Sequence, residues 1–147
     1  MRVLAPITLA AALTFTLTGC FGNPVENLVE GAIEQQTGVD VDVNSDGSGA
    51  SLPADWPSDV PTPAGTVVAS FGVDGTYSAT IEMADAAAAQ AGLDALLAAG
   101  YESQSQADLG GMKMNVLTNG TWGVTYSWGE DGDGNTVLNM AVTPAPQ

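Results

Sequence analysis

The sequence predicts a small α+β domain, in which an antiparallel sheet is packed against one helix. After residue 65, apolar and polar residues alternate in several short segments, and the dipeptides Asp74-Gly75 and Asn119-Gly120 separate two pairs of them. A single run rich in Ala and Leu, residues 86–99, has the composition of a helix. Because tight turns join antiparallel strands, we expect the order β-β-α-β-β-β-β over residues 66–147.

Two alternating segments flank the Asp74-Gly75 dipeptide and predict a β-hairpin. Their apolar positions are Val67, Ala69 and Phe71 before the turn, and Tyr77, Ala79, Ile81 and Met83 after it. Asp85 then has the residue type of a helix N-cap, and Gly100 that of a C-terminal stop. Between them, Leu93, Leu96 and Leu97 form the apolar side of the predicted helix.

Four further strands are expected after the helix. Residues 101–107 form a weak, polar candidate, and Gly110-Gly111 turns the chain into the alternating segment around Met112 and Met114. Beyond Asn119-Gly120, one side of the next strand carries Trp122, Val124, Tyr126 and Trp128. Residues 130–135 form a third turn, and the last apolar stripe consists of Leu138, Met140 and Val142.

The region before this domain has a different composition. From residue 24 to 37, Val25, Leu28, Val29, Ala32 and Ile33 recur at helical spacing, which predicts a short helix. The polar, Gly-rich stretch 40–49 predicts a flexible spacer. Residues 52–65 hold four prolines and predict a stiff extended segment, from which Trp56 and Val60 press onto the domain.

Residues 1–19 have the pattern of a secretory signal. Arg2 supplies the positive charge, and residues 3–17 are apolar apart from a few Thr, too short for a comfortable membrane span. Leu17-Thr18-Gly19-Cys20 matches a lipobox, so the chain resembles bacterial lipoproteins that are cleaved before the cysteine and acylated on it. An ordinary secretory signal with an incidental cysteine is the alternative.

The resemblance implies a diacylglyceryl group on Cys20, and two acyl chains suffice for stable anchoring. We therefore expect a protein held by its lipid on the extracytoplasmic face of the cell membrane. The resulting division is a signal at 1–19, a lipidated N-terminus with helix and spacer at 20–65, and the α+β domain at 66–147. Cys20 is the only cysteine, so acylation leaves no thiol and no disulfide.

Charge excludes several partners. The chain holds 17 Asp and Glu against 2 Lys and Arg, for a formal net charge of −15. Such a balance argues against nucleic acid and against electrostatic attraction to anionic lipid headgroups. It leaves open a cationic partner, a metal ion, or a surface that is acidic only for solubility.

The residue types also restrict catalysis. The chain has no histidine, which excludes Ser-His-Asp and Cys-His arrangements and histidine metal ligands. Carboxylates alone remain, as in glycoside hydrolysis, but no pair is marked by the sequence. We therefore expect a non-enzymatic protein, with a carboxylate-based hydrolase as a remote alternative.

Two acidic turns are candidate calcium sites, because both place oxygen ligands at alternate positions. The first is Asp42, Asn44 and Asp46, followed by Gly47; the second is Asp131, Asp133 and Asn135. Neither has an acidic residue at the twelfth position of an EF-hand loop, where Pro53 and Val142 stand. Both fit ordinary Gly/Asp turns equally well. Met112 and Met114, with Met83 and Met140, suit Cu(I), although filling of the core is the favoured interpretation.

The aromatic residues Trp122, Tyr126 and Trp128 share one face of a predicted strand and leave two interpretations open. Aromatic residues at this spacing are usually core. If the stripe faces away from the helix, it becomes a binding face for a sugar or a protein, with Trp56 as a cover.

The whole layout is similar to small uncharacterised lipoproteins of actinobacteria. The resemblance rests on the lipobox, the Glu-rich segment 29–34 and the stretch Leu-Pro-Ala-Asp-Trp-Pro-Ser-Asp-Val-Pro at 52–61. Few Lys and abundant Ala and Gly are typical of such high-GC genomes. The resemblance transfers no activity. We expect a module that binds a protein or an envelope component, with a solute- or calcium-binding lipoprotein as the alternative.

Overall fold

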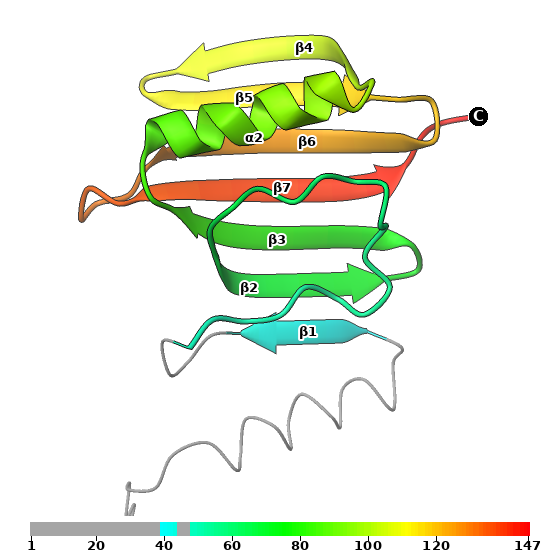
Figure 1. The fold of residues 1–147 in the computed structure, drawn as a ribbon, viewed down its shortest axis with the longest axis horizontal. Coiled ribbons are helices and arrows are strands. Elements are labelled where there is room, and N and C mark those ends of the chain that lie inside the picture. The colour runs from blue at the N-terminus through cyan, green and yellow to red at the C-terminus, as the bar shows by residue number, and fades with distance from the viewer. Residues whose placement is uncertain (1–38, 44–47) are drawn as a thin grey trace, which may run out of the picture.

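A computed structural model describes residues 39–43 and 48–147. Its elements are β1 (Asp40–Val43), β2 (Thr66–Val73), β3 (Thr76–Met83), α2 (Ala86–Ala98), β4 (Glu102–Leu109), β5 (Met112–Thr118), β6 (Trp122–Glu130) and β7 (Thr136–Pro144). The strands form one seven-stranded antiparallel sheet in the order β1-β2-β3-β7-β6-β5-β4, with α2 across one face (Figure 1). The predicted α+β class, a sheet with one helix packed on it, is confirmed.

The last strand lies at the centre of the sheet. β7 pairs with β3 on one side and with β6 on the other, so that Ile81, Leu138 and Trp128 are neighbours in register. The hairpins β2–β3, β4–β5, β5–β6 and β6–β7 are local, whereas the β3–β7 pairing joins distant parts of the sequence. This one pairing unites the two groups of hairpins into a single sheet.

The turn between β2 and β3 follows its sequence signal. Asp74 has φ of 49° and Gly75 has φ of 77°, as a type I′ turn requires of its two central residues. Asp tolerates this left-handed conformation better than most residues, and Gly adopts it freely. The hairpin is thus set by two adjacent residues.

The helix begins and ends close to its predicted bounds. The Asp85 carboxylate accepts a hydrogen bond of 2.7 Å from the backbone N–H of Ala88, which caps the first turn. At the other end Gly100 has φ of 91°, a left-handed conformation that stops the helix. The side facing the sheet carries Ala89, Leu93 and Leu96, which are buried as the helix packs on β6, β3 and β7.

The core lies between the sheet and two covering elements on the same face. One cover is α2, and the other is the segment of residues 50–65, named here the proline strap (Figure 1). Residues on the central strands that point to these covers are almost completely buried: Ala79, Ile81, Val124, Tyr126, Leu138, Met140 and Val142. Val60 of the strap is 3% exposed and belongs to this core.

The proline strap is anchored to β1, an edge strand that we did not expect. Within the predicted flexible spacer 40–49, residues Asp40–Val43 instead form a strand that pairs with β2. The Asp42 carboxylate accepts the backbone N–H of Ser51 at 2.7 Å, and that of Asp40 accepts the N–H of Ala54 at 2.8 Å. Pairing with β2 fixes this segment as an edge strand, and its two Asp side chains hold the strap.

The strap itself contains turns where a stiff extended segment was predicted. The backbone N–H of Trp56 bonds to the carbonyl of Pro53 at 2.9 Å, and that of Val60 to the carbonyl of Pro57 at 3.1 Å. These turns fold the segment back onto the sheet, where Pro53 lies against Gly72. The expected pressing of Trp56 and Val60 onto the domain is present, since both pack with the core.

Several predictions lie outside the described residues. They are the signal 1–19, the acylation site Cys20 and the short helix within 24–37. Within the described part of the chain, no helix has the length and apolar character needed to cross a membrane.

Candidate functional site

The centre of the predicted aromatic stripe lies inside the core. Tyr126 is 0% and Trp128 is 4% exposed, and their rings meet edge to face with centroids 5.6 Å apart. The Tyr126 hydroxyl donates a hydrogen bond of 2.8 Å to the carbonyl of Ala89 in α2. These two residues are therefore part of the packing between sheet and helix rather than an exposed binding face. The register of β6 turns them toward α2, which settles the alternative that their spacing left open.

Burial also determines the electrostatics of the two core tyrosines. Loss of solvent raises the pKa of the Tyr126 phenol far above its ordinary value of 10.0, and the Asp94 carboxylate raises it further. The pKa of Tyr101 is raised as well, by burial first and by Asp59 second. Both phenols stay neutral at physiological pH. A raised pKa fits a structural hydrogen-bond donor such as Tyr126 better than a proton acceptor in catalysis.

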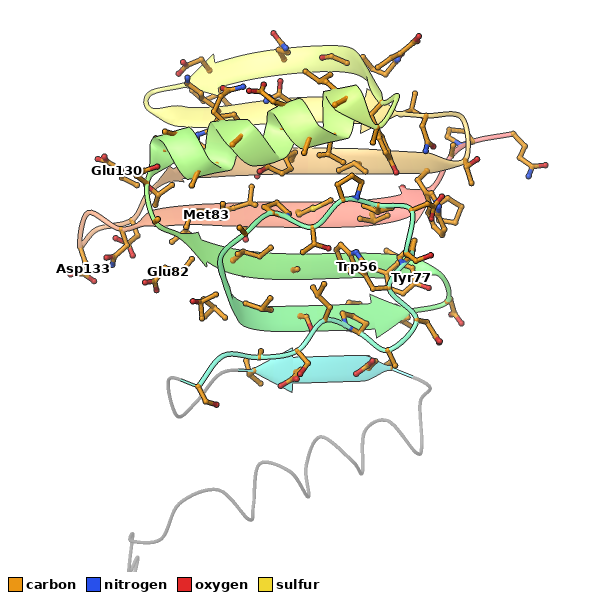
Figure 2. The ribbon with its side chains drawn as sticks, in the orientation of Figure 1. Trp56, Tyr77, Glu82, Met83, Glu130 and Asp133 are labelled. Carbon is orange, nitrogen blue, oxygen red and sulfur yellow. The ribbon has the colours of Figure 1, made fainter. Side chains whose placement is uncertain are left out.

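The remaining aromatic residues form a separate cluster near the other end of the sheet. Trp122 packs edge to face on Tyr77, at a centroid distance of 6.3 Å, and Tyr77 packs on Trp56 of the strap at 5.9 Å. Figure 2 shows Trp56 and Tyr77 together beside the strap. Trp122 and Trp56 are half-buried, and the Trp56 indole nitrogen is buried without a hydrogen-bond partner. The cluster holds the strap in place.

The second acidic turn is satisfied by its own chain. The Asp131 carboxylate accepts hydrogen bonds from the backbone N–H groups of Asp133 and Asn135, both at 2.9 Å, and from the Asn135 side-chain amide at 3.1 Å. The bonds from Asn135 are the main reason why the pKa of Asp131 is lowered from 3.8. The D-x-D-x-N spacing is thus accounted for by an Asx-type turn.

The first acidic turn is described only in part, since Asn44 and Asp46 lie outside the described residues. Asp42 uses one carboxylate oxygen to hold the strap. Among residues 39–43 and 48–147, no three acidic side chains gather as a metal site would require. The four methionines considered for copper do not converge either: Met83 and Met140 are core, whereas Met112 and Met114 lie on the opposite face of the sheet.

The face of the sheet opposite α2, named here the open face, has no covering element among the described residues. One row across it runs through Ala69, Thr80, Asn139, Ser127, Met114 and Ala107. The Thr80 hydroxyl bonds to the Asn139 side chain at 3.0 Å. The middle of this face is small, polar and uncharged. Since the chain as a whole carries a formal charge of −15, this uncharged strip is a distinct part of its surface.

Apolar side chains gather on the open face where the β4–β5 hairpin forms one side of the sheet. This hairpin patch consists of Leu109, Met112, Met114 and Val116, which point to the same face. Leu109 is 61% and Met112 is 46% exposed, and the other two are half-buried. The favoured interpretation of Met112 as core is wrong. The residues of β5 that point toward the core include Asn115 and Leu117, and Met112 points to the opposite face.

Three carboxylates, Glu82, Glu130 and Asp133, lie at the end of the sheet that carries the β6–β7 turn (Figure 2). The pairing of β6 with β7 turns Glu130 to the side of α2, and β7 and β6 separate Glu82 from β5. Met112 packs against Gly129, the residue before Glu130. The sequence contains the signal for the hairpin patch, an alternation of Met and Val with other residues. It does not show which side of the strand remains uncovered in the fold.

Comparisons with known proteins identify no relative. No family model matches the chain, and neither the curated proteins nor the solved structures yield a match.

Proposed function

We propose that this protein is a non-enzymatic binding module, anchored by a lipid on Cys20 at the extracytoplasmic face of the cell membrane, that docks a partner protein on its hairpin patch. The lipobox supports the anchor, and the residues before the domain separate it from the membrane. The observation that carries the proposal is the exposed apolar patch at one side of the open face. Contiguous apolar surface of this kind marks interaction sites.

The shape of the patch favours a macromolecule. It lies on the open face of a sheet, so a partner with its own extended surface gains the most contact from it. Met side chains are flexible and adapt to a partner's contour. An apolar centre with a polar or charged rim is the usual anatomy of a protein interface.

The overall charge indicates the partner's charge. The whole chain carries a formal charge of −15. A second copy of the chain brings the same negative charge to the interface, which opposes self-association. A partner with an apolar strip bordered by Lys or Arg is complementary and is attracted from a distance.

The electrostatics of Asp131 do not fit the role of a general acid. A carboxyl that acts as general acid needs a raised pKa, as in glycoside hydrolases. The Asp131 carboxyl is exposed, and its pKa is shifted downward. This property suits a turn and a solvated surface.

The anchor is tested by a single substitution. Cys20→Ser removes the only thiol that can carry the lipid, so we expect the protein to move from the membrane fraction to the soluble fraction. Metabolic labelling with a fatty acid should mark the unmodified protein and not the variant. Equal membrane association of the two forms would contradict a lipid anchor.

The docking surface is tested by photo-crosslinking in cells that express the full chain. A photoreactive amino acid at Met112 should yield a discrete adduct, which Leu109→Ser reduces and high salt weakens. The matched control places the same probe at Thr121 in the β5–β6 turn, an exposed position outside the hairpin patch. No adduct at Met112, or an adduct of the mass of two copies of this chain, contradicts the proposed partner.

A further inference from the structure

The β4–β5 hairpin has a second surface, on the same side of the sheet as α2. The helix packs on β6, β3 and β7, so a groove lies between it and the hairpin beyond. The groove has a cavity volume of about 320 Å³ and is lined by Gln90, Leu93, Gln106, Asp108, Lys113 and Asn115, with Trp128 also in its wall. This volume lies at the lower end of the range for small-molecule sites.

A cation stands in this groove without an acidic partner. Lys113 is the only Lys or Arg among the described residues, and its ammonium lies 5.7 Å from the centre of the Trp128 ring. Asp108 is its direct neighbour across the β4–β5 pairing, yet the two form no ion pair. In a strongly acidic chain, an ammonium held over an aromatic ring and left without a carboxylate is available to a ligand.

The side-chain amide of Asn115 lines the same groove as the Lys113 ammonium. Asn115 is 5% exposed, lines the groove, and makes no side-chain hydrogen bond to any residue in the described part of the chain. The polar atoms of the Asn115 amide are not fully buried, so they reach the solvent of the groove and can form a hydrogen bond to a ligand there. On the helix side, the Gln90 amide nitrogen donates to Asp94 at 3.1 Å, which orients its carbonyl oxygen for another donor.

We propose that this groove binds a zwitterion, a free amino acid or a dipeptide with uncharged side chains. Its carboxylate pairs with Lys113, its ammonium pairs with Asp108, and the amide of Asn115 bonds to the peptide or carboxylate group. A zwitterion has no net charge, so the acidic protein does not repel it as it repels a simple anion. The groove opens on the side of α2 and the hairpin patch lies on the open face, although Met114 contributes to both.

The test titrates the full chain in detergent with L-alanyl-L-alanine and follows the amide signals of Asn115 and Gln90 by NMR. Two further probes each alter one end group: N-acetyl-alanyl-alanine lacks the ammonium, and alanyl-alanine amide lacks the carboxylate. A third probe, N-acetylglucosamine, replaces the peptide by a sugar. We expect saturable binding of alanyl-alanine and at least about tenfold weaker binding of each altered probe.

Variants then separate the roles. Lys113→Met keeps an unbranched side chain over Trp128 but removes the charge, and should weaken alanyl-alanine binding about tenfold or more while leaving the amide form unaffected. Asp108→Asn should show the complementary pattern with the N-acetylated probe. The control Asp133→Asn makes the same change of charge outside the groove and should bind as the unmodified protein does.

The outcomes divide cleanly. Binding of alanyl-alanine that depends on both end groups, on Lys113 and on Asp108 supports the proposal. No saturable binding up to about 10 mM, equal binding of all peptide forms, or binding of N-acetylglucosamine alone overturns it.

Discussion

The two halves of the sheet are covered differently, although one antiparallel ladder runs through both. Strands β3, β7 and β6 lie beneath α2 and the proline strap and supply most of the core. The β4–β5 hairpin extends beyond these covers, and β4 has no buried residue along its length. The covered strands therefore contribute most of the hydrophobic stabilisation, whereas the hairpin presents more surface that is available for contacts.

This difference separates stability from recognition. The hairpin joins the rest of the sheet through the β5–β6 pairing, and its two faces carry the hairpin patch and the polar groove. Elements with few buried apolar contacts open more readily and are commonly used for binding. In this protein the same hairpin carries both surfaces because its outer strand β4 has no buried residue, although Leu117 of β5 belongs to the core.

Cutting a large side chain to Ala should give the largest contrast between the halves. Leu138→Ala removes a side chain that is 0% exposed at the centre of the sheet and should lower the free energy of unfolding by about 2–5 kcal/mol. The matched change Leu109→Ala removes the same atoms at a site 61% exposed and should stay within about 0.5 kcal/mol. Urea unfolding followed by tryptophan fluorescence measures both. Equal losses would show that the hairpin is packed as tightly as the core.

An intermediate effect is expected where α2 meets the covered half. Gly92 of the helix faces the Tyr126 hydroxyl, and a Cβ there would also come within 2.9 Å of Pro63 in the strap. Helix propensity favours Ala over Gly by about 1 kcal/mol, but overpacking of this kind typically costs about 1–3 kcal/mol. We expect Gly92→Ala to lower the melting temperature.

The same position offers an internal control. Adding Tyr126→Phe to Gly92→Ala removes the oxygen that collides with the new methyl group, so the double variant should lose less than the sum of the single losses. A melting temperature that rises in the single variant would mean that backbone propensity, rather than the contact between helix and sheet, decides the site.

The smallest effect concerns the turn between β6 and β7. Because the pKa of Asp131 is lowered in the folded protein, its contribution to stability is present above the unfolded value of 3.8 and is lost as pH falls through the folded value. Asn135→Ala removes the side-chain donor and should move the pKa of Asp131 back toward 3.8 in an NMR titration. Asn119→Ala in the β5–β6 turn is the control, and an equal shift there would point to a global change.

Much of the fold was accessible from local patterns. The Asp74-Gly75 turn, the Asp85 cap and the Gly100 stop are chemical requirements of single positions, so the first hairpin and the helix were predictable. Strand β1 was not, because its four residues open a polar, Gly-rich stretch, and the strand forms by pairing with the distant β2. The turns of the strap likewise depend on the sheet against which Pro53 and Trp56 pack.

The candidate sites show the same division. Alternation around Met112 and Met114 predicted a strand correctly. Each side of that strand carries apolar residues, and only the position of α2 decides which side is covered. Lys113 was recognisable as a lone cation, whereas its place over Trp128 depends on the pairing of β5 with β6. No sequence pattern indicated that Asn115 is buried in a groove.

The sequence by itself determined the turns, the helix bounds, the strand periodicity and the acidic charge, because each depends on residues close together in the chain. The tertiary structure decided the central place of β7, the burial of Tyr126 and Trp128, and the exposure of β4 and Met112 at one side of the sheet. These features depend on which distant segments meet, since a side chain is core only when another element covers it.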